Sequence, residues 1–231
     1  MITIEISFIN AVVEQNYIIW IEFYTFAQTQ TTIMGLRSKL KKYLLHKRLP
    51  METYVPIKKT KPEKMVEMVT AWAGLELIIE DILERFNIGR DSCIEFGVEF
   101  GYSSVVFSNY FKEVKGIDIF IGDEHTDHKG DHYDKTKASL AEFTNIELIK
   151  SDYRDWIQKD TKQYNFSHVD IVHNYKETYE CGLWAAQHSE CTVFHDTESF
   201  PEVRRAVIDI AKATGKRVYN YPHCNGLGII V

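Results

Sequence analysis

The sequence has few cysteines and no excess of positive charge. The four cysteines, Cys93, Cys181, Cys191 and Cys224, are scattered and form no CxxC pair. This spacing argues against a structural zinc site and predicts reduced thiols, as expected of a cytoplasmic protein. The net charge is -6, which argues against a protein that binds nucleic acid mainly through its phosphates. We therefore expect a small polar ligand or a glycan and no nucleic-acid partner.

Long apolar runs are also missing, and so is early positive charge. The apolar run at 17–27 is interrupted by Glu22 and is too short to span a bilayer. No Lys or Arg occurs before Arg37, and residues 37–48 are then strongly basic. Because a signal peptide carries its positive charge first, this order does not predict one. The sequence thus predicts neither a transmembrane segment nor a secretory leader.

The basic segment 36–48 is expected to form a helix. It is either a solvated helix or one that makes a weak peripheral contact with an anionic membrane, because Leu36, Leu40 and Leu44 share a face. Residues 1–33 allow two interpretations. Either the natural start is Met34, or the segment is a real extension whose aromatic residues pack on the domain or support a homo-oligomer contact.

Three prolines at 50, 56 and 62 mark a linker, so we predict an N-terminal helical extension and linker at 1–60 and a domain at 61–231. Helical spacing predicts helices over 65–72 and 75–86, interrupted near Gly74. Further along the chain, strands are predicted at 92–96, 114–118, 146–150, 169–173, 191–195, 217–221 and 227–231, with helices at 102–111, 135–143, 179–188 and 201–214.

This alternation predicts an α/β fold, a Rossmann-like seven-stranded sheet that is mainly parallel. The last two strands are separated by five residues, PHCNG, at 222–226. Such a connection is too short for a parallel crossover, so the C-terminal strand is expected to be antiparallel.

The segment SCIEFGVEFGYSS at 92–104 carries the main functional signal. A buried strand leads to Glu95, then to Gly97 and Gly101, and then to a helix start whose amides can meet an anionic group. Asp118 ends the next strand, 21 positions after Gly97, where an acid can bind the hydroxyls of a ribose. Together these features predict a nucleoside cofactor.

In these motifs the chain resembles class I S-adenosylmethionine-dependent methyltransferases, in particular the group that modifies small molecules and glycans. The resemblance covers residues 61–231. It rests on Glu95-x-Gly97-x-x-x-Gly101, on Asp118, on Ser151-Asp152-Tyr153 and on His195-Asp196-Thr197. It implies the strand order 3-2-1-4-5-7-6 and S-adenosylmethionine as the cofactor.

The resemblance also implies roles for the residues of the cofactor site, which are Glu95, Gly97, Gly101, Tyr102, Ser103, Asp118, Asp152 and Tyr153. Glu95 would hold the ammonium, directly or through water, and Asp118 the ribose. Asp152 would contact the adenine amine, with Tyr153 beside the ring. Each acid also has a structural alternative: a surface charge for Glu95, a turn former for Asp118, and the N-cap of a helix at 153–157 for Asp152.

The expected reaction is transfer of a methyl group to a hydroxyl of a sugar, a glycan or another small molecule. His195, Asp196 and His173 are the predicted catalytic residues, with His195 as the neutral base, and Asn174 and Glu177 are predicted to bind the substrate. The resembling group often carries an Asp-Gly-Asp-His-like segment after strand four. Here the expected strand-end carboxylate is missing from HNYKETYE at 173–180, so no metal ligands are assigned.

Two further classes of protein remain as alternatives, a cofactor-binding subunit without catalytic activity and a nicotinamide-dependent oxidoreductase. The second is disfavoured by the GxxxG spacing. One more cluster of acids and histidines lies at 123–134. Its residue types could bind a metal, but we expect a lid or a substrate-recognition loop there.

Overall fold

The computed structural model describes residue 40 and residues 43–122 and 129–231. The chain divides into two units, 1–48 and 49–231. In the first unit, residues 43–48 are helical, with Tyr43 and Leu44 exposed. None of the described helices combines the length and the apolar character needed to cross a membrane. The predictions about 1–33, and most of the acid and histidine cluster, lie outside the described residues, and the membrane contact of 36–48 stays a prediction.

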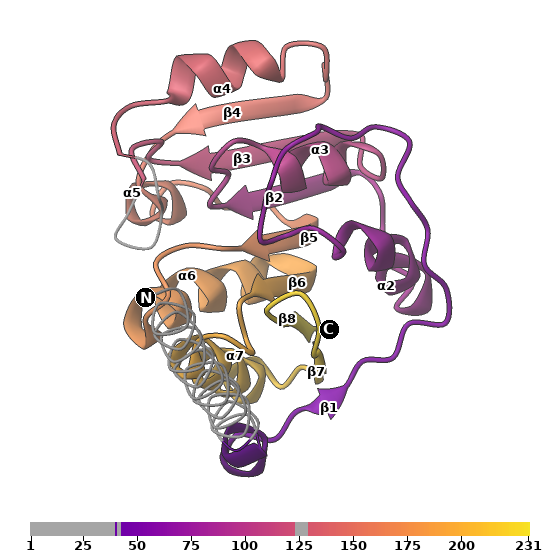
Figure 1. The fold of residues 1–231 in the computed structure, drawn as a ribbon. Coiled ribbons are helices and arrows are strands. Elements are labelled where there is room, and N and C mark those ends of the chain that lie inside the picture. The colour runs from indigo at the N-terminus through magenta and orange to yellow at the C-terminus, as the bar shows by residue number, and fades with distance from the viewer. Residues whose placement is uncertain (1–39, 41–42, 123–128) are drawn as a thin grey trace, which may run out of the picture. The chain divides into compact units, whose positions relative to one another are not determined.

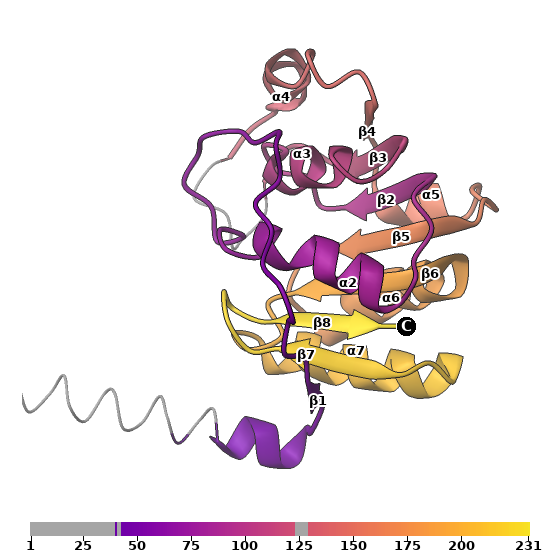
Figure 2. The same cartoon turned by 90° about the vertical axis from the view of Figure 1, so that its right-hand side faces the viewer.

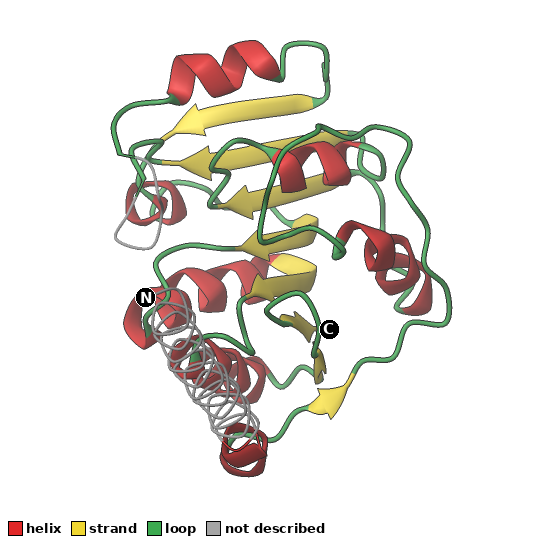
Figure 3. Ribbon diagram, viewed as in Figure 1, coloured by secondary structure: helices red, strands yellow, loops and turns green. Residues whose placement is uncertain are grey.

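The second unit contains a mixed sheet of eight described strands (Figures 1 and 3). In chain order these are β1 (Glu52–Thr53), β2 (Ser92–Phe96), β3 (Glu113–Asp118), β4 (Ile146–Lys150), β5 (Tyr164–Val169), β6 (Ser189–His195), β7 (Val218–Tyr221) and β8 (Leu227–Ile230). Their spatial order is β1-β7-β8-β6-β5-β2-β3-β4. From β4 back to β7 this is the predicted order, and β8 is antiparallel to both of its neighbours. The short edge strand β1, parallel to β7, was not predicted.

Helices cover both faces of the sheet (Figure 2). They are the 3₁₀ turn η1 (Glu76–Ile78), α2 (Ile79–Arg85), α3 (Tyr102–Ser108), α4 (Tyr133–Ser139), α5 (Tyr153–Ile157), α6 (Tyr175–His188) and α7 (Pro201–Thr214). Side chains of η1, α2 and α3 pack with Cys93 and Phe166 in one core, and those of α5, α6 and α7 pack with Ile94 and Phe96 in another. Both faces of β2 are therefore buried, which explains why its sequence does not alternate between apolar and polar residues.

Two predicted elements are wrong. Residues 65–72 form no helix in the structure, although their spacing is helical. The backbone at Lys64 is instead bound by the side chain of Asn109, which accepts from the Lys64 amide and donates to the Lys64 carbonyl. The strand predicted at 169–173 is also shifted, because β5 ends at Val169.

Candidate functional site

Two glycines build the turn that follows β2. Gly97 has φ of +89°, and a Cβ there would lie 1.8 Å from the carbonyl oxygen of Asp170. Gly101 has φ of +87° and would place a Cβ 2.4 Å from Leu140. Both positions therefore require glycine, for conformation and for space. The turn brings the backbone after β2 directly against the backbone after β5.

Asp118, at the end of β3, holds this turn in place. Its Oδ2 accepts hydrogen bonds from the amides of Val98 at 2.7 Å and Glu99 at 2.9 Å, and its Oδ1 accepts from Phe120 at 2.6 Å. A carboxylate has roughly four acceptor positions, so most of its capacity is used by the backbone. Asp118 therefore holds a turn, which is the structural role that the sequence analysis gave as its alternative. It also lines the cavity described below.

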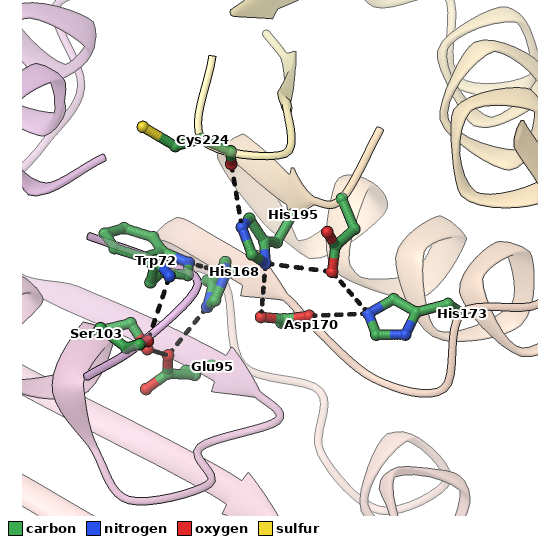
Figure 4. Close-up of polar contacts among 10 residues, drawn as sticks. Trp72, Glu95, Ser103, His168, Asp170, His173, His195 and Cys224 are labelled. Atoms are coloured by element: carbon green, nitrogen blue, oxygen red, sulfur yellow. Dashed lines mark hydrogen bonds and ion pairs between the residues drawn. The ribbon is translucent and has the colours of Figure 1, made fainter. Parts of the chain in front are cut away.

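Glu95 points into the interior and does not line that cavity. Its carboxylate accepts from the hydroxyls of Ser103 and Ser104 and lies 2.9 Å from Nδ1 of His168 (Figure 4). The Nε1–H of Trp72 donates to Nε2 of His168 over 3.1 Å, which places the remaining ring proton on Nδ1. Glu95 thus ties β2, α3 and β5 together, and the geometry gives no support to direct contact with a ligand.

At the next strand end, Asp152 is the N-cap of α5. Its side chain accepts from the amide of Arg154 at 2.8 Å and also pairs with the Arg154 guanidinium at 3.2 Å. Arg154 forms a second ion pair with Glu177 of α6. The hydroxyl of Tyr153 donates to Glu180 over 3.1 Å. These contacts join α5 to α6 beside the cavity.

A cavity of about 780 Å³ lies at the carboxyl ends of the strands. It is lined from one side by Gly97, Asp118 and Tyr153, and from the other by Asp170 and His195. Strands β2 and β5 are neighbours whose chains continue in opposite directions across the sheet. This is the topological switch point, where α/β sheets bind their ligands. The volume lies within the range of about 300–1,000 Å³ of small-molecule sites.

Of the predicted site residues, Gly97, Tyr102, Ser103, Asp118, Asp152, Tyr153, His173, Glu177, His195 and Asp196 line this cavity. Asn174 does not, since its side-chain oxygen caps α6 by accepting from the amide of Glu177 at 3.0 Å. Within the cluster predicted at 123–134, His132 lines the cavity and Asp131 pairs with Lys150.

Asp170 is the carboxylate that the sequence interpretation reported as missing. Residues 169–172 are apolar except for Asp170, so the predicted strand at 169–173 ran past this residue. In the structure β5 ends at Val169, one residue before Asp170. An acid therefore follows strand four after all, and the reason for leaving metal ligands unassigned was wrong. The signal that could have revealed it is a lone Asp within an apolar run, which marks a strand end.

Asp170 and Asp196 face two imidazoles, those of His173 and His195. Figure 4 shows both rings directed at Asp170. Nδ1 of His195 lies 3.0 Å from Asp170 Oδ2 and 3.4 Å from Asp196 Oδ2. Nε2 of His173 lies 2.8 Å from Asp196 Oδ2 and 3.4 Å from Asp170 Oδ1. The His173 ring also stacks on Phe200, with centroids 4.2 Å apart. Asp170, His195 and Asp196 present ligand atoms that all lie within 4.8 Å of one another, so this donor set fits a metal ion.

The charges of this cluster are strongly coupled. Burial would raise the pKa of Asp170, but the imidazoles of His195 and His173 hold it well below its usual range. Burial would lower the pKa of His173, but Asp170 and Asp196 raise it to about 10. Asp170 also raises the pKa of His195 against the effect of burial. These raised pKa values favour the charged form of both rings when no cation is bound, which disfavours His195 as the neutral base.

The backbone at Asp196 is held in an unusual conformation, with φ of +66°. Next to it, the Thr197 hydroxyl donates to Asn220 at 2.5 Å, and Glu198 forms a buried ion pair with Arg204 at 2.8 Å. A non-glycine residue with positive φ persists where its surroundings hold it. This network positions the Asp196 carboxylate at the cavity.

The mainly parallel sheet, the antiparallel β8 and the glycine turn at the switch point define the class I methyltransferase fold. No protein-family model matches the chain, and no curated protein matches it by sequence. Solved structures do match. The O-methyltransferase NovP has a TM-score of 0.54 at 12% identity, covering 68% of this chain and 76% of NovP.

An O-methyltransferase from Bacillus cereus, solved in complex with SAH, has a TM-score of 0.50 at 10% identity. The match covers 74% of this chain and 84% of the Bacillus protein. At this level of identity the likeness concerns the fold alone, and the chain has the fold of class I methyltransferases.

Proposed function

We propose that the protein is an S-adenosylmethionine-dependent methyltransferase that methylates a hydroxyl of a sugar, a glycan or another small molecule. The observation that carries this proposal is the charge of the cavity at the switch point. Its described lining includes one guanidinium, that of Arg154, and the imidazoles of His132, His173 and His195, against six carboxylates, those of Glu99, Asp118, Asp152, Asp170, Glu177 and Asp196. An anionic cavity attracts a ligand that carries a sulfonium and an ammonium.

The same charge disfavours the alternative nicotinamide cofactor, because the pyrophosphate of that cofactor needs positive charge or exposed amides. The names of NovP and the Bacillus cereus protein support an oxygen acceptor, and the SAH in the second supports the cofactor. The cradle for the cofactor would be the turn at Gly97, with Asp118 at the ribose and Tyr153 beside the adenine. When bound, S-adenosylmethionine supplies an electrophilic methyl group.

The residues around the acceptor would orient it and take its proton. A carboxylate oxygen of Asp196 would accept a hydrogen bond from an acceptor hydroxyl and draw its proton away as the oxygen attacks, whereas Asp170, whose pKa is held well below its usual range, would only orient that hydroxyl. Trp72 and Phe200 line the same cavity and would exclude water around the reacting atoms. Holding the acceptor in line with the methyl group is the main contribution expected from the protein. Glu177 lines the cavity from α6 and would contact the acceptor there.

Calorimetric titration with S-adenosylmethionine, S-adenosylhomocysteine and NAD tests the cofactor. The proposal expects binding of the first two, with Asp118→Asn weakening both. Asp91→Asn is the matched control, because Asp91 is an exposed acid directly before β2 that pairs with Lys112. Binding of NAD without binding of S-adenosylmethionine would contradict the proposal.

Labelled cofactor, offered with a panel of sugar nucleotides, glycans and catechols, tests the acceptor. A labelled product extracted with one of these hydroxyl compounds supports the proposed reaction. If the cofactor binds but no compound of the panel is labelled, the result contradicts the proposed acceptor class and favours the inactive cofactor-binding subunit.

A further inference from the structure

Residues 68–72 form one wall of the cavity, although they belong to no helix or strand. A turn fixes the inner end of this wall. The amide of Trp72 donates to Oγ1 of Thr70 over 3.1 Å, and the amide of Leu75 donates to the carbonyl of Trp72 over 3.0 Å. The wall therefore has a defined shape without regular secondary structure.

Trp72 anchors the inner end of the wall in the protein interior. Its Nε1–H donates to His168, whose other ring nitrogen faces Glu95 (Figure 4). The indole is 3% exposed, and its ring centroid lies 6.4 Å from that of His195. The wall thus begins beside the cluster where the acceptor hydroxyl is expected.

The outer end of the wall is apolar and open to solvent. Val69 is fully exposed, and Met68 next to it is exposed as well. Ile119, which directly follows β3, is a third exposed apolar residue in the lining of the same cavity. Exposed apolar side chains that gather at a cavity mark a place where a ligand buries apolar surface.

The charged part of the cavity has the opposite preference, because it repels phosphate. Six carboxylates contribute to the described lining, which contains no lysine. The guanidinium of Arg154 is already paired with Asp152 and Glu177, and two of the imidazoles face Asp170 and Asp196. A phosphate on the acceptor would meet negative charge without an unpaired arginine or lysine from this lining.

We infer that the acceptor is a phosphate-free hydroxyl compound with an apolar body, and that Met68 and Val69 select it by contacting that body. The inference rests on the proposed function and narrows its acceptor class. Glycosides with an apolar aglycone and alkylated alcohols or phenols fit the cavity better than sugar nucleotides or bare sugars do. The hydroxyl would lie at Asp196, with the apolar body along residues 68–72.

Binding of matched probes tests this without methyl transfer. Methyl and phenyl β-glucoside form one pair, catechol and 4-butylcatechol form a second, and UDP-glucose represents the sugar nucleotides. The full chain is first titrated calorimetrically with S-adenosylhomocysteine, so failure of the proposed cofactor is recorded separately. Each probe is then titrated with and without that ligand. In at least one pair the apolar member should have a dissociation constant at least about tenfold lower, and UDP-glucose should bind more weakly than phenyl glucoside.

The double variant Met68→Ser, Val69→Ser should reduce this preference to about threefold or less, because the apolar body loses its contact. Val55→Ser with Ile57→Ser is the matched control, since these side chains are also exposed but do not line the cavity. Equal affinity within both pairs, no binding of any probe, or tighter binding of UDP-glucose than of phenyl glucoside would overturn the inference.

Two results with the double variant would also overturn it. One is an apolar preference that this variant retains in full. The other is a change of oligomeric state in size-exclusion chromatography, which would assign Met68 and Val69 to a contact between copies of the chain.

Discussion

The carbonyl oxygen of Asp170 lies 1.8 Å from the point where a Cβ on Gly97 would stand. The turn after β2 and the acid after β5 are thus in contact. The two halves of the candidate site can approach this closely only because residue 97 is a glycine and has no side chain. Gly97→Ala must move one of the two backbones and also adopt φ of +89° with a Cβ. We expect a loss of about 2 kcal/mol or more in the free energy of unfolding.

Chemical denaturation measures this loss, and Gly215→Ala is the matched control. Gly215, at the end of α7, also has a positive φ of +69°, but no atom lies within 4 Å of its would-be Cβ. The control should lose about 1 kcal/mol, the cost of the left-handed conformation alone. Equal losses in the two variants would show that the contact with Asp170 is unimportant.

A substitution of Glu95 distinguishes a role in stabilising the fold from a role in binding the cofactor. Glu95→Gln keeps the shape of the side chain but removes the charge that accepts from Ser103, Ser104 and His168. We expect the free energy of unfolding to fall by about 1–3 kcal/mol. The affinity for S-adenosylhomocysteine should change by less than threefold, because Glu95 does not line the cavity. A large loss of affinity without a loss of stability would restore the predicted contact with the ammonium.

Arg204 supports the loop that carries Asp196. It is 2% exposed, and it pairs with Glu198 and donates to the carbonyl of Leu49. Arg204→Met leaves Glu198 buried without its partner and should cost about 3–5 kcal/mol in the free energy of unfolding. The neighbouring Arg205→Met removes an exposed pair with Asp209 and should change stability by less than about 1 kcal/mol. Thermal melts of both variants check this ranking.

The four thiols should differ in reactivity. Cys93, Cys181 and Cys191 are buried, whereas Cys224 is half-exposed. Partial burial, and then the charge of Glu76, raises the pKa of Cys224, so less thiolate is present at pH 8 than in an ordinary cysteine. Iodoacetamide labelling followed by mass spectrometry should modify Cys224 first, slowly at pH 8 and faster as the pH rises. Modification of Cys93 in the folded protein would contradict the described packing.

Sequence signals were reliable where they are local. Pro201 and Gly215 bracket α7 as predicted, and the N-cap alternative for Asp152 was confirmed. The five-residue link before β8 correctly predicted an antiparallel strand. Each of these depends on backbone conformations that a few neighbouring residues determine.

The sequence interpretation failed where distant contacts decide the outcome. The helical spacing at 65–72 gives way to an irregular segment bound at Lys64 by Asn109, a partner 45 positions away. The burial of Glu95 depends on His168 and Trp72, which no motif connects to it. Asp170 was missed because the apolar run continues beyond the last paired residue of β5. None of these contacts is visible in a single sequence.

The most direct test of the account is a crystal structure of the protein grown with S-adenosylhomocysteine. The account predicts adenosyl density in the cavity at the carboxyl ends of β2 and β5, with the turn at Gly97 against the ligand and Tyr153 beside the adenine. Its sulfur should face the cluster of Asp170, His195 and Asp196. Density for the ligand elsewhere, or a cavity without it at saturating ligand, would contradict the assignment of this site.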